Sequence, residues 1–152
     1  MARIDLRYQK MIKAGEESIV EKPVEYFLKM VERGWEPLIR RFIFIAELHN
    51  LIVHQIKEKF GCLRLHHVAD EKSKFEFFKN VYTSDEINLK IGANLRISEL
   101  EVLSSYICEY CGKYGKSRND LGWIKTLCEE CHEEKLKSLK KKQEEYKQLK
   151  LF

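Results

Sequence analysis

Two short motifs, Cys108-Glu109-Tyr110-Cys111 and Cys128-Glu129-Glu130-Cys131, stand on either side of residues 112–127. Two residues between cysteines allow a tight turn to aim both thiolates at one metal ion, and two such turns complete a tetrahedron. The separation of the two motifs lies within the range of structural zinc sites. The sequence therefore predicts a zinc ribbon over residues 108–131, with Cys108, Cys111, Cys128 and Cys131 as the metal ligands.

These cysteines have two alternative arrangements. Disulfide pairs are one alternative, but nothing in the sequence indicates secretion. His132 is an alternative fourth ligand, although the symmetry of the two motifs favours Cys131. A site closed by four thiolates has no open coordination position, so the zinc is expected to be structural and not catalytic. Cys62, which lacks an activating pattern beyond Lys59 and Arg64, is expected to be an ordinary buried thiol.

The composition is typical of a single small domain or of a domain with a metal-stabilised appendage. Of 152 residues, 44% are hydrophobic and 34% are charged, and the formal net charge of +4 permits nucleic-acid contact without requiring it. No apolar run is long enough to cross a membrane, and the N-terminus lacks the apolar region of a secretory signal. We therefore expect a cytoplasmic protein.

The periodicity of apolar residues predicts an α+β fold. The expected helices cover residues 3–13, 23–33, 37–50, 85–106 and 129–147, and a strand–turn–strand hairpin covers about 51–68. The inward side chains of helix 85–106 are expected to be Ile87, Ile91, Leu95, Leu100 and Leu103. Helix 129–147 has almost no apolar face beyond Leu136 and Leu139, so it should project from the body. The expected domains are a helical domain with the hairpin (1–107), the zinc ribbon (108–131), and a charged helix with its tail (132–152).

Three segments resemble small uncharacterised proteins of phages and prophages. They are Gly34-Trp35 with Leu38-Ile39, QIKEKFG at 55–61 with Leu63-Arg64, and GWIKTLC at 122–128. Those proteins pair a QVKEKFGxLRFY-like segment with a CExCG…GWxKTLCxxH ribbon, and the likeness spans roughly residues 34–131. This chain has Cys131 where the family often has histidine, and residues 69–84 look like an insertion. The resemblance implies a phage or prophage accessory protein and carries no established activity.

The last five residues, QLKLF at 148–152, are similar to the bacterial sliding-clamp-binding pentapeptide QL[SD]LF. The resemblance implies a host protein, the replication sliding clamp, as partner. The partner-binding residues would be Gln148, Leu149, Leu151 and Phe152, with glutamine at the rim of an apolar pocket and the Leu-Phe pair inside it. Lys150 stands where serine or aspartate is usual. The alternative is a tail that folds its Leu-Phe pair onto the core.

A nucleic-acid-binding zinc module is a second functional hypothesis. The phosphate-contacting residues would be Lys57, Lys59, Arg64, Lys116, Arg118, Lys140, Lys141 and Lys142. A solvated strand edge explains the hairpin cations equally simply. A third hypothesis is an inhibitor of a bacterial defence or replication enzyme, such as an anti-CRISPR-like protein, that acts through its globular surface.

An enzyme is not expected from this sequence. No nucleophile motif, phosphate loop or carboxylate constellation stands out, and no small-molecule substrate is indicated. His66 and His67 are adjacent on an expected strand, so they should face opposite sides and not share a metal ion.

Overall fold

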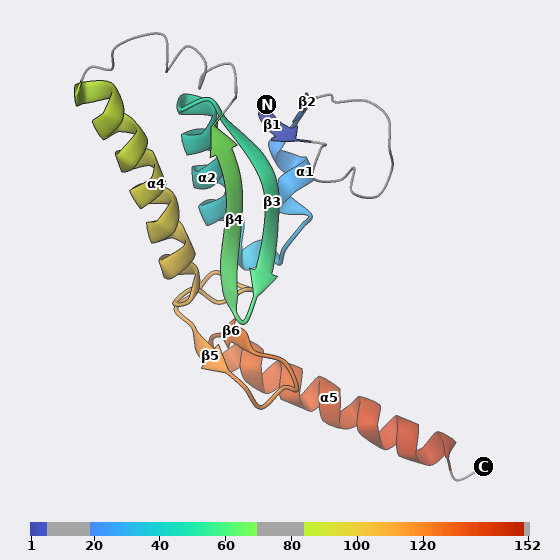
Figure 1. Ribbon diagram of the computed structural model, residues 1–152. Coiled ribbons are helices and arrows are strands. Elements are labelled where there is room, and N and C mark those ends of the chain that lie inside the picture. The colour runs from blue at the N-terminus through green and yellow to red at the C-terminus, as the bar shows by residue number, and fades with distance from the viewer. Residues whose placement is uncertain (6–18, 70–83, 151–152) are drawn as a thin grey trace.

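In the computed structural model, residues 1–5, 19–69 and 84–150 are described, and they form a mixed α+β structure (Figure 1). The strands are β1 (Ala2–Asp5), β2 (Ile19–Lys22), β3 (Leu51–Lys59), β4 (Cys62–Ala69), β5 (Lys116–Arg118) and β6 (Lys125–Leu127). The helices are α1 (Val24–Leu28), the short 3₁₀ helix η1 (Arg33–Trp35), α2 (Glu36–Leu48), α4 (Ser84–Ser104) and α5 (Glu129–Leu149). The predicted α+β class is confirmed.

The main sheet has the strand order β2-β1-β3-β4. Strand β1 pairs antiparallel with β2 and parallel with β3, and β3 forms the predicted hairpin with β4. The hairpin turns at Phe60 and Gly61, which both have positive φ. Helix α2 packs against the sheet and supplies much of the core. The core includes the buried side chains of Phe27, Trp35, Ile39, Phe42, Ile43, Val53, Ile56 and Leu63.

Strand β4 is an edge strand of the main sheet, and helix α4 lies along it. The backbone N–H of Leu63 donates to Ser104 Oγ at 2.8 Å, and that of Leu65 donates to Glu101 Oε1 at 2.7 Å. An uncovered edge of this kind would offer free N–H groups to another chain. Two polar side chains of α4 therefore close the sheet on this side.

The inward face of α4 differs from the prediction. Leu100 is buried as expected, but Leu95 and Leu103 are 60% and 48% exposed. The buried face consists of Ala93, Ile97, Leu100 and Ser104, which recur at helical spacing. Short side chains at both ends of this row allow α4 to lie close to β4, and the larger leucines are left outside. Ile87 and Ile91 lie where side chains are not described.

Two helix predictions near the N-terminus are also corrected. Residues 3–5 belong to strand β1 and not to a helix, because β1 pairs with strands β2 and β3, which are distant in sequence. The rest of the predicted helix, residues 6–13, lies outside the described residues. The helix expected over 23–33 ends at Leu28, and residues 33–35 form η1 instead. The helix predicted over 37–50 is found as α2.

Helix α5 extends away from the rest of the molecule, as Figure 1 shows. Residues 140–150 are all exposed, in agreement with the expectation of a projecting helix. Among the described residues, no helix has the length and apolar character needed to cross a membrane.

Candidate metal centre

The first cysteine pair lies in a tight turn between α4 and β5. The N–H of Cys108 donates to the carbonyl of Lys113 at 2.7 Å, and the N–H of Gly112 donates to the carbonyl of Cys108 at 3.0 Å. Gly112 has a φ of 77°, a left-handed conformation that glycine adopts without steric cost. This backbone geometry turns Cys108 and Cys111 toward the same point, as the sequence predicted.

The second pair is positioned by a helix and not by a second tight turn. Cys128 is the N-cap of α5, and Cys131 lies in the first turn of that helix. The N–H of Cys131 points at Cys128 Sγ at 3.5 Å. A helix start spaces residues at N-cap and N3 on one side, so it presents two sulfurs together. Its free N–H groups also favour negative charge on these thiolates.

The four sulfurs form one compact cluster, the cysteine cluster. All four Sγ atoms lie within 4.8 Å of one another, and Cys111 Sγ and Cys128 Sγ are 3.6 Å apart. Sulfurs bound to one tetrahedral zinc ion at about 2.3 Å are about 3.8 Å apart. None of the five cysteines forms a disulfide. The cluster could therefore hold a metal ion, and the disulfide alternative is not supported.

The electrostatics of the cysteine cluster favour a bound cation. Burial opposes ionisation of Cys108, but backbone N–H groups near its sulfur outweigh burial and lower the pKa of this thiol to about 7. Burial raises the pKa of Cys131, and contacts with the other three sulfurs raise it further. Burial and two neighbouring thiols also raise the pKa of Cys111. Four thiols this close resist common ionisation unless a positive charge lies between them.

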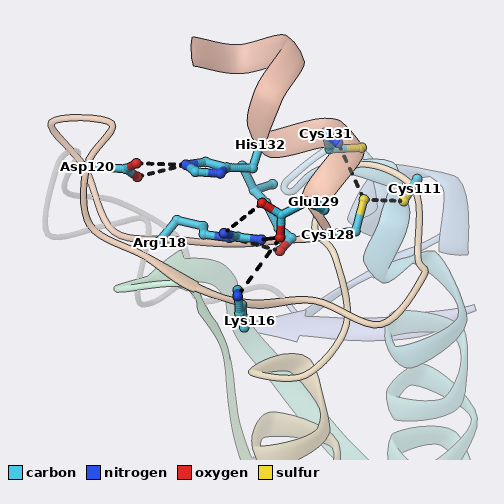
Figure 2. Close-up of polar contacts among 9 residues, drawn as sticks. Cys111, Lys116, Arg118, Asp120, Cys128, Glu129, Cys131 and His132 are labelled. Atoms are coloured by element: carbon cyan, nitrogen blue, oxygen red, sulfur yellow. Dashed lines mark hydrogen bonds and ion pairs between the residues drawn. The ribbon is translucent and has the colours of Figure 1, made fainter.

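His132 lies beside the cysteine cluster but is used elsewhere. Its Nε2 atom lies 2.8 and 2.9 Å from the two carboxylate oxygens of Asp120, and Figure 2 shows this pair on the side of α5 away from Cys111. The contact ties the loop after β5 to the first turn of α5. The structure gives no support to His132 as an alternative metal ligand.

Glu109, inside the first motif, is the residue that sequence reasoning missed. It is 0% exposed, and its carboxylate accepts from Lys125 Nζ at 2.6 Å and from the N–H of Thr126 at 2.9 Å. Its own N–H donates to the carbonyl of Thr126 at 2.9 Å. Burial raises the pKa of this carboxyl group, while Lys125 and the Thr126 amide oppose the rise. Glu109 thus joins the first cysteine turn to β6 and so to the second pair.

The segments that carried the phage-protein resemblance meet at this turn. The N–H of Gly34 donates to the carbonyl of Glu109 at 2.7 Å, and the buried Trp35 donates through Nε1 to the carbonyl of Ile107 at 2.8 Å. Thr126 Oγ1 donates to the carbonyl of Gly61 at 2.7 Å. The cysteine cluster is therefore built into the main domain and is not a loosely attached appendage.

The predicted phosphate-contacting residues fall into three groups. Lys116 and Arg118 lie 3.9 and 2.8 Å from the carboxylate of Glu129 (Figure 2). Arg118 is only 11% exposed and holds β5 against α5, whereas Lys116 remains 63% exposed. Lys57, Lys59 and Arg64 lie together on the hairpin. Lys140, Lys141 and Lys142 lie on the exposed part of α5.

The predicted partner-binding residues lie at the far end of α5. Gln148 and Leu149 belong to its last turn, and Leu149 is 76% exposed. Leu151 and Phe152 lie outside the described residues. Cys62 is partly buried, and burial raises the pKa of its thiol, which agrees with an unreactive cysteine.

Comparison of the chain with protein-family models, with curated proteins and with solved structures found no match.

Proposed function

We propose that this protein is a non-enzymatic phage or prophage accessory protein that binds a host protein, the replication sliding clamp, through its C-terminal segment 148–152. The observation that carries the proposal is the combination of the QLKLF sequence with helix α5, whose last turn carries Gln148 and Leu149 away from the body (Figure 1). Leu149 is 76% exposed, and no described element packs against the last turns of α5. A peptide that docks through side-chain anchors must be accessible in this way.

We further propose that the metal is zinc and that its role is structural. Four cysteine ligands select a soft, tetrahedral ion, and a four-thiolate site leaves no position for substrate. Because Cys128 is the N-cap of α5, the ion would fix where this helix begins and in which direction it leaves the domain. The metal would then orient the segment that binds the partner.

Docking requires one local change. Gln148 and Leu149 are helical in the free protein, whereas docking of this kind uses an extended peptide. The last four carbonyl groups of a helix lack helical partners, so unwinding the final turn breaks few hydrogen bonds. The globular domain need not rearrange.

The test is direct binding of the purified protein to an immobilised, purified bacterial sliding clamp. The double variant Leu151→Ala/Phe152→Ala should lose at least about 30-fold in affinity, because loss of two buried anchors costs about 2 kcal/mol or more. Tyr146→Ala, which removes another exposed α5 side chain outside the segment, is the matched control and should bind as wild type. Lys150→Asp should bind more tightly, because it restores the usual residue.

Binding that survives removal of residues 148–152 would overturn the proposed mode. Failure of the wild-type protein to bind the clamp at all would overturn the proposed partner. The metal proposal is tested separately by elemental analysis, which should find one zinc ion per chain.

A further inference from the structure

We infer that the outer face of the β3–β4 hairpin, together with the exposed side chain of Phe60 at its tip, is a binding surface for single-stranded nucleic acid. This inference is independent of the proposed clamp binding, because it uses a different surface. Side chains along the hairpin alternate between its two faces. Ile56 and Leu65 face the core, so Lys57, Lys59 and Arg64 face the opposite side.

The cations on this face lie in an arrangement that does not stabilise the free protein. Lys57 stands directly opposite Arg64 in the hairpin register, and Lys59 stands opposite Cys62. Like charges at facing positions repel each other. Among the described residues, no carboxylate lies within ion-pair distance of these three cations. A bound polyanion would relieve this repulsion, and a phosphate backbone supplies such charge.

The aromatic side chain at the hairpin tip distinguishes nucleic acid from other anionic partners. Phe60 is 59% exposed, so more than half of this side chain is open to a partner. Trp123, in the loop between β5 and β6, meets the hairpin from the other side: its Nε1 donates at 3.3 Å to Glu58, which lies on the same face as the buried Leu63. Phe60 is therefore the exposed ring beside the cations. Exposed rings beside cations are suited to stacking on unpaired bases.

The details of Phe60 support this assignment. Phe60 has a φ of 54°, a conformation that bulky residues rarely adopt, so the turn accepts strain in order to present this ring. Lys59 Nζ lies 5.5 Å from the centre of the ring, which places a cation and a stacking surface side by side. Bases within a duplex are already stacked, so single strands should bind more tightly than duplexes.

The lysines of α5 provide the matched comparison. Lys140, Lys141 and Lys142 are exposed cations, and Glu144 and Glu145 follow them on the same helix. The hairpin variant Lys57→Gln/Lys59→Gln/Arg64→Gln and the α5 variant Lys140→Gln/Lys141→Gln/Lys142→Gln remove the same formal charge. A purely non-specific attraction would weaken equally in both.

The experiment measures fluorescence anisotropy of a labelled oligothymidylate of about 20 nucleotides, and of a duplex of equal length, over a range of salt concentrations. Wild type should prefer the single strand, and its affinity should fall with salt. The hairpin variant should lose at least about tenfold, with a salt slope smaller by about 2, because each phosphate contact contributes about 0.7 to the slope. The α5 variant should change less than about threefold.

A second variant tests stacking without altering charge. Phe60→Asn keeps a residue that tolerates positive φ, so the turn should fold, and its affinity should fall about fivefold or more. Thermal unfolding of each variant checks that the fold is retained. The inference would be overturned by equal losses in the two charge variants, by wild-type affinity of Phe60→Asn, by stronger binding to the duplex, or by no binding to either nucleic acid.

Discussion

Replacement of Gly34 by alanine tests whether the main domain and the metal centre form one unit. A Cβ atom at this position would lie 2.2 Å from the carbonyl oxygen of Cys108 and 2.4 Å from that of Glu109. Both obstacles are backbone atoms, so no side-chain rotation can relieve the clash. Gly34 does not have a positive φ, so its backbone alone would accept alanine. The cost therefore comes entirely from packing against the first cysteine turn.

The magnitude follows from three contributions. Overpacking of a close contact costs about 1–3 kcal/mol. Separation of η1 from the turn also weakens the hydrogen bond from the Gly34 N–H to the Glu109 carbonyl, which is worth about 1 kcal/mol. Lower entropy of the unfolded chain offsets about 0.4–1 kcal/mol. The Gly34→Ala protein should therefore be less stable than wild type by about 2–3 kcal/mol.

The assay is urea unfolding of the metal-loaded protein, followed by far-ultraviolet circular dichroism at constant free metal concentration. Gly92→Ala is the matched control, because a Cβ atom at Gly92 in α4 would meet no atom within 4 Å. This control should be more stable than wild type by about 0.5–1 kcal/mol, owing to the higher helix propensity of alanine. If Gly34→Ala were as stable as wild type, the inferred contact between η1 and the cysteine turn would be wrong.

Three further predictions concern the metal centre and its attachment. In the metal-loaded protein a thiol reagent should modify only Cys62, and slowly, because burial raises the pKa of this thiol. After addition of a chelator, all five cysteines should react. Equal numbers of modified cysteines before and after chelation would argue against a metal-bound cluster. Thr126→Val should destabilise the protein by about 1–2 kcal/mol in thermal or urea unfolding, because the buried Gly61 carbonyl loses its donor; a wild-type unfolding midpoint would contradict this. Trp35→Phe should cost a similar amount through loss of the donor to the Ile107 carbonyl, and elemental analysis should still find a full complement of metal.

Several elements were predictable because their signals are local. The hairpin over 51–68, helix α2 and helix α5 each follow from the periodicity of a continuous segment. The cysteine pairs were predictable because metal ligation restricts spacing within each motif. By contrast, β1 is four residues long and takes its partners from strands distant in sequence, so no local pattern separates it from a helix.

The inward face of α4 and the role of Glu109 could not be predicted for a related reason. Leu95 and Leu103 have helical periodicity, but Ser104 and Glu101 hold α4 against the free N–H groups of β4 and turn these leucines outward. A glutamate between two cysteines gives no sign of burial. It becomes buried because Lys125 and the Thr126 amide, from a separate strand, converge on its carboxylate.

The sequence by itself determined that four cysteines would be available in two pairs, that helix α5 would be charged and unpacked, and that QLKLF would stand at residues 148–152. These features depend on residue type and short-range spacing, which folding does not alter. Only the tertiary structure decided that the second pair begins a helix, that Gly34, Trp35 and Gly61 meet the first pair, and that Lys57 faces Arg64 without a carboxylate partner. Those relations arise from backbone hydrogen bonds and packing between distant segments, which no local pattern specifies.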